Sequence, residues 1–205
     1  QVNVMNRWQY NDAEKGWVSF INLRYMRDEK QTGELDFDPD QHKFTTHHWG
    51  SEINTDKVDV SAKLGYVWPD MPFQSVGVQT AFNWHNQESY FGLNQYDINQ
   101  KSFYSNLIFS SIISNTLNKF STGLNMTYDN YGEFVNTADF SRIDNSVGAF
   151  FEYTYDNADD FTVVAGARFD VHNRLGAFFT PRIHARYTPW DKAVIRASAG
   201  RGKRA

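Results

Sequence analysis

The segment "FFTPRIHARYTPWDKAVIRASAG", residues 178–200, decides the fold class because its residues alternate in character. One parity is apolar or small and the other is polar. The first parity holds Pro181, Ile183, Ala185 and Tyr187, then Ala193, Ile195, Ala197 and Ala199. The second holds Thr180, Arg182, His184 and Arg186, then Arg196 and Ser198. A period of two is typical of a β-strand with one apolar face. The segment therefore predicts two strands, each with arginines on its second face.

The same alternation recurs along the chain and predicts about ten strands in all. The other eight are Val2–Tyr10, Trp17–Arg27, Lys57–Trp68, Phe73–Trp84, Lys101–Ile113, Lys119–Tyr128, Ser146–Tyr155 and Phe161–Val171. Most are about 9–12 residues long, whereas strands of soluble proteins usually have about five or six. Tilted strands that cross a bilayer need about 9–11 residues. The strand length therefore favours a membrane barrel.

The predicted connections alternate between short and long. The short ones are Asn11–Gly16, Pro69–Pro72, Ser114–Asn118, Asp156–Asp160 and Thr188–Lys192. The longer ones are Asp28–Asp56, His85–Gln100, Asp129–Asn145 and the briefer His172–Gly176. Outer-membrane barrels combine tight periplasmic turns with longer external loops in this way. Trp8, Trp17, Trp68 and Trp190 lie beside the short turns, where an interfacial aromatic belt is expected.

Composition excludes several classes of protein. The 205 residues include no cysteine, so disulfide frameworks and thiolate chemistry are excluded. A net charge of −4 argues against a nucleic-acid binder. Aromatic residues make up 17% of a chain that is only 40% hydrophobic, which suggests thin apolar surfaces and not a thick core. The sequence shows no nucleophile elbow, phosphate loop or other catalytic arrangement, so we do not expect an enzyme.

Three stretches resemble the barrel portion of TonB-dependent outer-membrane receptors. They are "NRWQYNDAEKGWVSFINLRYM", "YSNLIFSSIISNTLNKFSTGLNMTYDNY" and, most specifically, "DVHNRLGAFFTPRIHARYTPWDKAVIRASAGRG". The resemblance implies that residues 1–205 are part of one antiparallel transmembrane β-barrel of about 22 strands, with no plug domain in this chain. Ten strands alone would leave two unpaired edges, which are costly in lipid. We therefore expect a longer barrel.

The resemblance also implies a function and a set of partners. Members of the family import scarce nutrients, of which a cobalamin or ferric siderophore is the expected cargo. The implied partners are outer-membrane lipid, the receptor's own plug and remaining strands, the TonB energy-coupling complex acting through that plug, and a surface lipoprotein. The expected location is the outer membrane of a Gram-negative bacterium.

The alternation assigns the two faces of the strands to two environments. Ile183, Ala185 and Tyr187 are expected to face lipid, because an arginine at the bilayer midplane would cost about 2–4 kcal/mol. The expected lumen wall of positive charge comprises Arg168, Arg182, His184, Arg186 and Arg196. Such a wall would attract anionic cargo or pair with carboxylates of the plug. Ion pairing between neighbouring strands is the alternative that we favour for most of these residues.

The long connections supply the remaining candidate residues. Asp36, Asp38 and Asp40 have the spacing that begins a calcium loop, but Gln41 replaces the glycine of the EF-hand template. Some cobalamin-importing members of the family order their external loops with calcium, so a Ca²⁺ site is a hypothesis, with a solvated acidic loop the favoured alternative. The candidate ligand platform at the external mouth comprises His47, His48, Trp49, Tyr90, Tyr131 and Phe134. The alternatives are that the aromatic rings pack loop on loop and that the histidines are simply exposed.

Two other architectures remain as alternatives. The first is a self-contained ten-stranded outer-membrane barrel, either a small pore or a protease with its catalytic groups at the rim. The small residues expected on its inner face suit a wider barrel better. The second is a soluble ligand-binding barrel, which would have the apolar face inside. The long strands and the placement of tryptophan argue against it.

Overall fold

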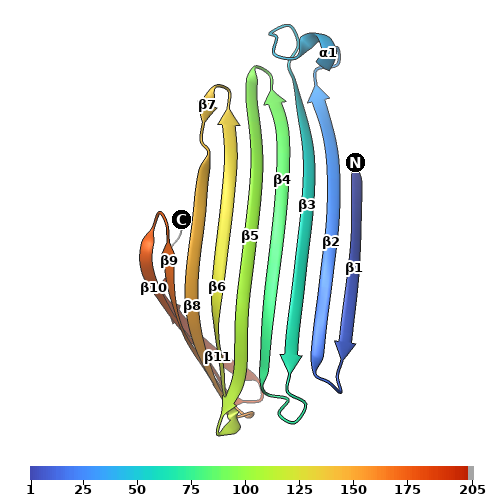
Figure 1. Cartoon of the computed structure of the whole chain (residues 1–205). Coiled ribbons are helices and arrows are strands. Elements are labelled where there is room, and N and C mark those ends of the chain that lie inside the picture. The colour runs from blue at the N-terminus through green and yellow to red at the C-terminus, as the bar shows by residue number, and fades with distance from the viewer. Residues whose placement is uncertain (203–205) are drawn as a thin grey trace.

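The computed structural model describes residues 1–202, which form a single antiparallel sheet with one short helix (Figure 1). The strand order follows the chain from β1 to β11, with the two-residue strand β7 paired to β6 alone. The strands are β1 (Val2–Asp12), β2 (Trp17–Gly33), β3 (Gly50–Val67), β4 (Ser75–Phe91), β5 (Asn94–Ile113), β6 (Asn115–Val135), β7 (Ala138–Asp139), β8 (Arg142–Asp156), β9 (Phe161–His172), β10 (Gly176–Trp190) and β11 (Ala193–Gly200). Helix α1 is Pro39–His42. The prediction of about ten long strands is confirmed.

The strands continue well beyond their expected ends on the side of the long connections. The expected loops 85–100 and 129–145 were wrong over most of their length, because β4 ends at Phe91, β5 begins at Asn94 and β6 runs to Val135. The expected loop Asp28–Asp56 shrinks to residues 34–49. Outside the apolar band both faces become polar, so the alternation that marked the strands disappears. Polar cross-strand contacts keep the ladder intact, as where Asn99 Nδ2 donates to Asn86 Oδ1 at 2.9 Å.

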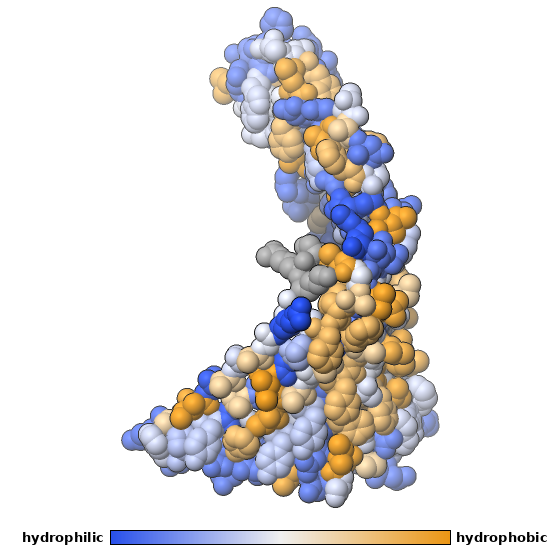
Figure 2. Space-filling view, turned by 90° about the vertical axis from the view of Figure 1, so that its left-hand side faces the viewer, coloured by the Kyte–Doolittle hydropathy of each residue, from blue (hydrophilic) through white to orange (hydrophobic). Residues whose placement is uncertain are grey.

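One face of the sheet is continuously apolar because the strands pair with matching parity. The registers place one such row across five strands: Leu23, Val60, Phe82, Phe103 and Tyr128. Ile183, Ala185 and Tyr187 lie on this same face, opposite Ala199, Ala197 and Ile195 of β11. Large apolar side chains that are exposed to solvent in this way need lipid. We call this surface the outer face and the polar one the inner face. Figure 2 shows the bend of the sheet and the broad hydrophobic area in its middle and lower part.

An aromatic belt crosses the outer face at the end with the short turns. Ring centroids lie 5.0 to 6.3 Å apart along one chain of contacts: Trp17, Tyr66, Trp68, Phe109, Phe120 and Phe151. Trp190 ends β10 as expected, but Trp8 lies inside β1, opposite Ile21. The apolar outer positions of β3 run from Tyr66 to Val58, and the next outer position, Asp56, is polar. That height matches a tilted strand crossing a bilayer.

The sheet is not closed in the described residues. β1 pairs only with β2, and β11 pairs only with β10, so each leaves one edge open. β9, β10 and β11 are shorter than β2 to β6 and run at an angle to them (Figure 1). Among residues 1–202, no helix has the length and apolar character needed to span a membrane.

Candidate functional site

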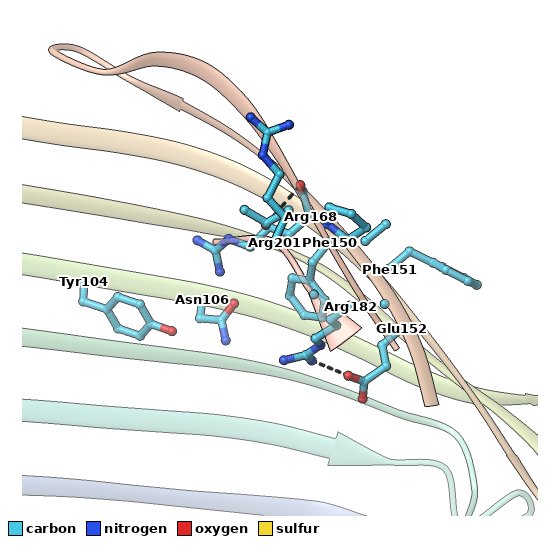
Figure 3. A pocket seen from close by; sticks show the side chains of 13 residues that line it. Tyr104, Asn106, Phe150, Phe151, Glu152, Arg168, Arg182 and Arg201 are labelled. Atoms are coloured by element: carbon cyan, nitrogen blue, oxygen red, sulfur yellow. Dashed lines mark hydrogen bonds and ion pairs between the residues drawn. The ribbon is translucent and has the colours of Figure 1, made fainter. Parts of the chain in front are cut away.

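Charged side chains on the inner face surround a hollow that reaches from β5 across β6 to β8, β9 and β10 (Figure 3). This inner hollow has a volume of about 360 Å³. Its polar and aromatic lining residues are Tyr104, Asn106, Phe150, Phe151, Glu152, Arg168, Thr180, Arg182 and Arg201. The hollow thus combines rings, an amide and three guanidinium groups on one wall.

Two of the arginines are paired with carboxylates of the chain itself. The Arg182 guanidinium forms an ion pair with Glu152 across the strands, and both groups are labelled in Figure 3. Arg168 Nε donates to both carboxylate oxygens of Asp170, at 2.9 and 2.7 Å. The Asp170 side chain is only 5% exposed, whereas that of Arg168 is 43% exposed. Of these two pairs, only Arg182 with Glu152 joins different strands, as favoured for the wall, whereas Arg168 pairs with Asp170 within β9.

Two glycines make room for these side chains. A Cβ atom at Gly166 would lie 2.9 Å from Arg182 Nε, so the arginine lies directly over that glycine. A Cβ atom at Gly148 would lie 2.1 Å from Asp170 Oδ1 and 2.7 Å from Asn125 Oδ1. Gly148 lies between these residues in the ladder, opposite Asn125 on β6 and Asp170 on β9. Because Gly148 has no side chain, the Asp170 carboxylate can lie close against the sheet.

The third arginine of the hollow, Arg201, was not among the sequence candidates. Its backbone nitrogen donates to the carbonyl of Pro181 at 3.0 Å, which continues the pairing of β11 with β10 beyond Gly200. Three arginines face two carboxylates in and beside the hollow, so its net charge is positive. Strict alternation would place Arg201 on the face of Ala197 and Ala199, so the pattern of the sequence did not indicate its position at the hollow.

The other basic wall residues lie nearer the short turns. Arg186 on β10 is directly opposite Arg196 on β11, and His184 is opposite Ser198. All are exposed on the inner face. The predicted inner placement of all five wall residues agrees with the register.

The six residues of the expected ligand platform do not lie together in the structure. His47, His48 and Trp49 lie in the connection between β2 and β3. His48 Nδ1 lies 3.2 Å from a carboxylate oxygen of Glu34, and its ring lies 4.6 Å from that of His42. Trp49 lies against Gly92 in the β4–β5 turn. These residues form a rim, not a shared pocket with the other three.

Tyr90, Tyr131 and Phe134 lie on strands and not in loops, which corrects the expectation. Tyr90 is buried beneath Phe44, with the Lys43 ammonium 4.7 Å from its ring, and this burial raises the pKa of its phenol. Tyr131 is opposite Arg142, whose guanidinium lies 4.2 Å from the ring. The ladder puts Tyr131 on the inner face, and Tyr90 and Phe134 on the parity of the outer face.

The three aspartates of the expected calcium loop are not arranged around a common point. Asp38 is the N-cap of α1, where its carboxylate accepts from Asp40 N at 3.0 Å and from Gln41 Nε2 at 2.9 Å. In residues 1–202 no three His, Asp or Glu side chains are placed to hold a metal. The geometry gives the Ca²⁺ hypothesis at Asp36, Asp38 and Asp40 no support.

Comparison with known proteins agrees with the geometry. The family model "TonB dependent receptor-like, beta-barrel" matches residues 3–205. The alcaligin outer-membrane receptor FauA from Bordetella pertussis superposes with a TM-score of 0.73 at 11% identity, over 96% of this chain and 34% of that one. The chain thus spans about a third of that receptor. The translocator domain of autotransporter NalP from Neisseria meningitidis gives a TM-score of only 0.43 at 8% identity, over 98% of this chain and 80% of that one. No curated protein matches in sequence.

Proposed function

Because the chain belongs to the TonB-dependent receptor-like β-barrel family, we propose that it forms part of the wall of a receptor that imports an anionic metal chelate across a Gram-negative outer membrane. A ferric siderophore is the preferred cargo and cobalamin is the alternative. The observation that carries this choice is the net positive inner hollow, with Arg168, Arg182 and Arg201 facing Glu152 and Asp170. Guanidinium groups bind carboxylate and catecholate-type oxygens through paired hydrogen bonds.

The residues of this chain would act by binding and guidance and not by covalent chemistry. The apolar outer face and the aromatic belt hold the wall in lipid. The loop 34–49 and the extended ends of β2 to β6 form one side of an external mouth. The plug, the contact with the TonB complex and a surface lipoprotein belong to the proposal for the whole receptor. Further strands are proposed to close the sheet, because open edges of β1 and β11 in lipid would cost several kcal/mol per unpaired group.

The mass of the native polypeptide tests whether further strands exist. The 205 residues weigh 23.8 kDa. We expect the intact protein from purified outer membranes to be several-fold heavier. A native mass near 23.8 kDa would require the ten strands to close alone, and the small pore or rim protease would then replace the importer.

Cargo uptake tests the function. Cells that lack the receptor would be complemented with the full-length gene, and uptake of ⁵⁵Fe-loaded siderophores would be compared with uptake of ⁵⁷Co-cobalamin. We expect iron uptake to depend on the receptor, and Arg201→Gln to reduce it severalfold because it removes the arginine that has no carboxylate partner in the hollow. Arg174→Gln is the matched control, since Arg174, in the β9–β10 turn, already has a carboxylate partner in Asp144 on β8. Receptor-dependent uptake of cobalamin alone would overturn the choice of cargo.

A further inference from the structure

Two arginines on the inner face meet without an intervening carboxylate. Arg186 and Arg196 are direct cross-strand partners in the pairing of β10 with β11. Directly opposite side chains have Cβ atoms about 4.5–5.5 Å apart, and like charges in this position destabilise a sheet. The pair therefore needs something to offset its repulsion.

The neighbouring positions within residues 1–202 do not offset it, and β11 has an open edge on the far side of Arg196. Arg186 has Thr162 on its other side, and His184 lies between Val164 and Ser198. Across residues 1–202, no ion pair involves Arg186, Arg196 or His184, whereas Arg182, on the same strand, is paired with Glu152. Asp156, opposite Thr162, is the carboxylate on the same row. It is two strands from Arg186, about 10 Å away, and accepts from Thr162 Oγ1 and Ala158 N.

A hollow of about 260 Å³ lies at this place, lined by Thr162, Val164, His184, Arg186, Arg196 and Ser198 together with two alanines. It is distinct from the inner hollow, with which it shares no lining residue. Two guanidinium groups, two hydroxyls and an imidazole thus line one recess. This is a set of donors with no acceptor that carries a negative charge.

We propose that Arg186, Arg196 and His184 form a binding site for one anionic group, a carboxylate or a phosphate, on the inner face near the short turns. The anion accepts hydrogen bonds from both guanidinium groups and removes their repulsion. It comes either from a diffusible anion or from a carboxylate in another segment of the same receptor. The site does not depend on which cargo the receptor imports.

Thermal unfolding of the full-length receptor tests the site, because the proposal predicts whether substituting an arginine lowers or raises the unfolding midpoint. Arg186→Gln and Arg196→Gln each remove one charge from the pair. Lys63→Gln is the control, because Lys63 is an exposed cation on the same face and forms no ion pair in the described residues. If an anion bridges the arginines, each glutamine variant lowers the unfolding midpoint by a few degrees, whereas the control shifts it much less. An unchanged or higher midpoint, the result of simple relief of repulsion, would overturn the proposal.

Added phosphate separates the two sources of the anion. The midpoint would be measured in phosphate and in chloride at equal ionic strength. A rise in phosphate that Arg196→Gln abolishes identifies a diffusible anion. A lower midpoint in the variants, with no response of the wild type to phosphate, identifies a carboxylate of the receptor itself.

Arg196→Lys keeps the charge and provides a folded variant should the glutamine variants fail to assemble. A midpoint for Arg196→Lys equal to that of wild type, with no phosphate response in either protein, would contradict a bidentate site.

Discussion

Arg168 binds the Asp170 carboxylate through its Nε, which donates to both carboxylate oxygens at 2.9 and 2.7 Å. The two residues are on the same strand and the same face, yet they differ greatly in exposure. The Asp170 side chain is 5% exposed and the Arg168 side chain is 43% exposed. The pair is therefore asymmetric, because only the carboxylate has lost its water.

This asymmetry predicts unequal effects of removing either partner. Arg168→Gln leaves a buried carboxylate without its cation, which we expect to cost about 3 kcal/mol of unfolding free energy. Asp170→Asn leaves an arginine that can still reach water, and its cost should stay below about 1 kcal/mol. Urea unfolding of the full-length receptor in lipid vesicles measures both values. Equal losses, or a larger loss for Asp170→Asn, would contradict this account.

Gly148 is predicted to be intolerant of any side chain. A Cβ atom there would lie 2.1 Å from Asp170 Oδ1, so Gly148→Ala must displace the carboxylate from Arg168. We expect a loss of about 1–3 kcal/mol in the same urea experiment. Gly65→Ala is the matched control, because a Cβ atom at Gly65, on the same face, would lie 3.7 Å from its nearest neighbour, the carbonyl oxygen of Val18. The prediction fails if the two alanine variants are equally stable.

The assignment of the two faces predicts that an introduced arginine is destabilising on the outer face and tolerated on the inner face. Ala62 on β3 is opposite Thr80 on β4, and Ala81 is the next residue of β4, so Ala62 and Ala81 lie at similar depth on opposite faces. Ala62→Arg places a cation in lipid near the midplane and should cost about 2–4 kcal/mol, whereas Ala81→Arg faces the wet lumen and should cost little. Both are compared by unfolding in vesicles. If Ala81→Arg proves the more harmful variant, the faces have been assigned the wrong way round.

The extended hairpins predict where a protease can cut from outside the cell. Lys43 is exposed in the connection between β2 and β3, whereas Lys101 is within β5, paired with Trp84 on one side and Asn130 on the other. Backbone in a paired strand does not enter a protease active site without local unfolding. Trypsin added to intact cells should therefore cut after Lys43 and spare Lys101. Mass spectrometry of the fragments reads the result, and early cleavage at Lys101 would favour a loop at residues 85–100.

The sequence predicted the membrane-spanning part of the fold because lipid imposes a strict rule on every second residue. Arg182 and Ile183 cannot exchange faces, so their order in the chain fixes the orientation of β10. Above the membrane water contacts both faces, and residues such as Asn86 and Asn99 carry no such constraint. Their strands form through side-chain and ladder hydrogen bonds that no periodicity reveals. That is why Tyr90 and Tyr131 were expected in loops.

The candidate site was only half predictable for a related reason. Parity placed Arg168 and Arg186 on the inner face, but it could not tell which arginine has a carboxylate within reach. That depends on the register between strands, which brings Glu152 to Gly166 and so beneath Arg182, and which sets Arg186 against Arg196. Register is a property of pairs of strands, so it cannot be predicted from the residue pattern of either strand alone.

The aromatic belt has a mechanical consequence. From Trp17 to Phe151, each ring contacts a ring on the same or a nearby strand at the same height. Sliding one strand along its axis would break these contacts as well as the backbone ladder. A load applied to one strand would thus be shared with its neighbours. The rings that set the depth of the wall in the membrane also make it resist shear.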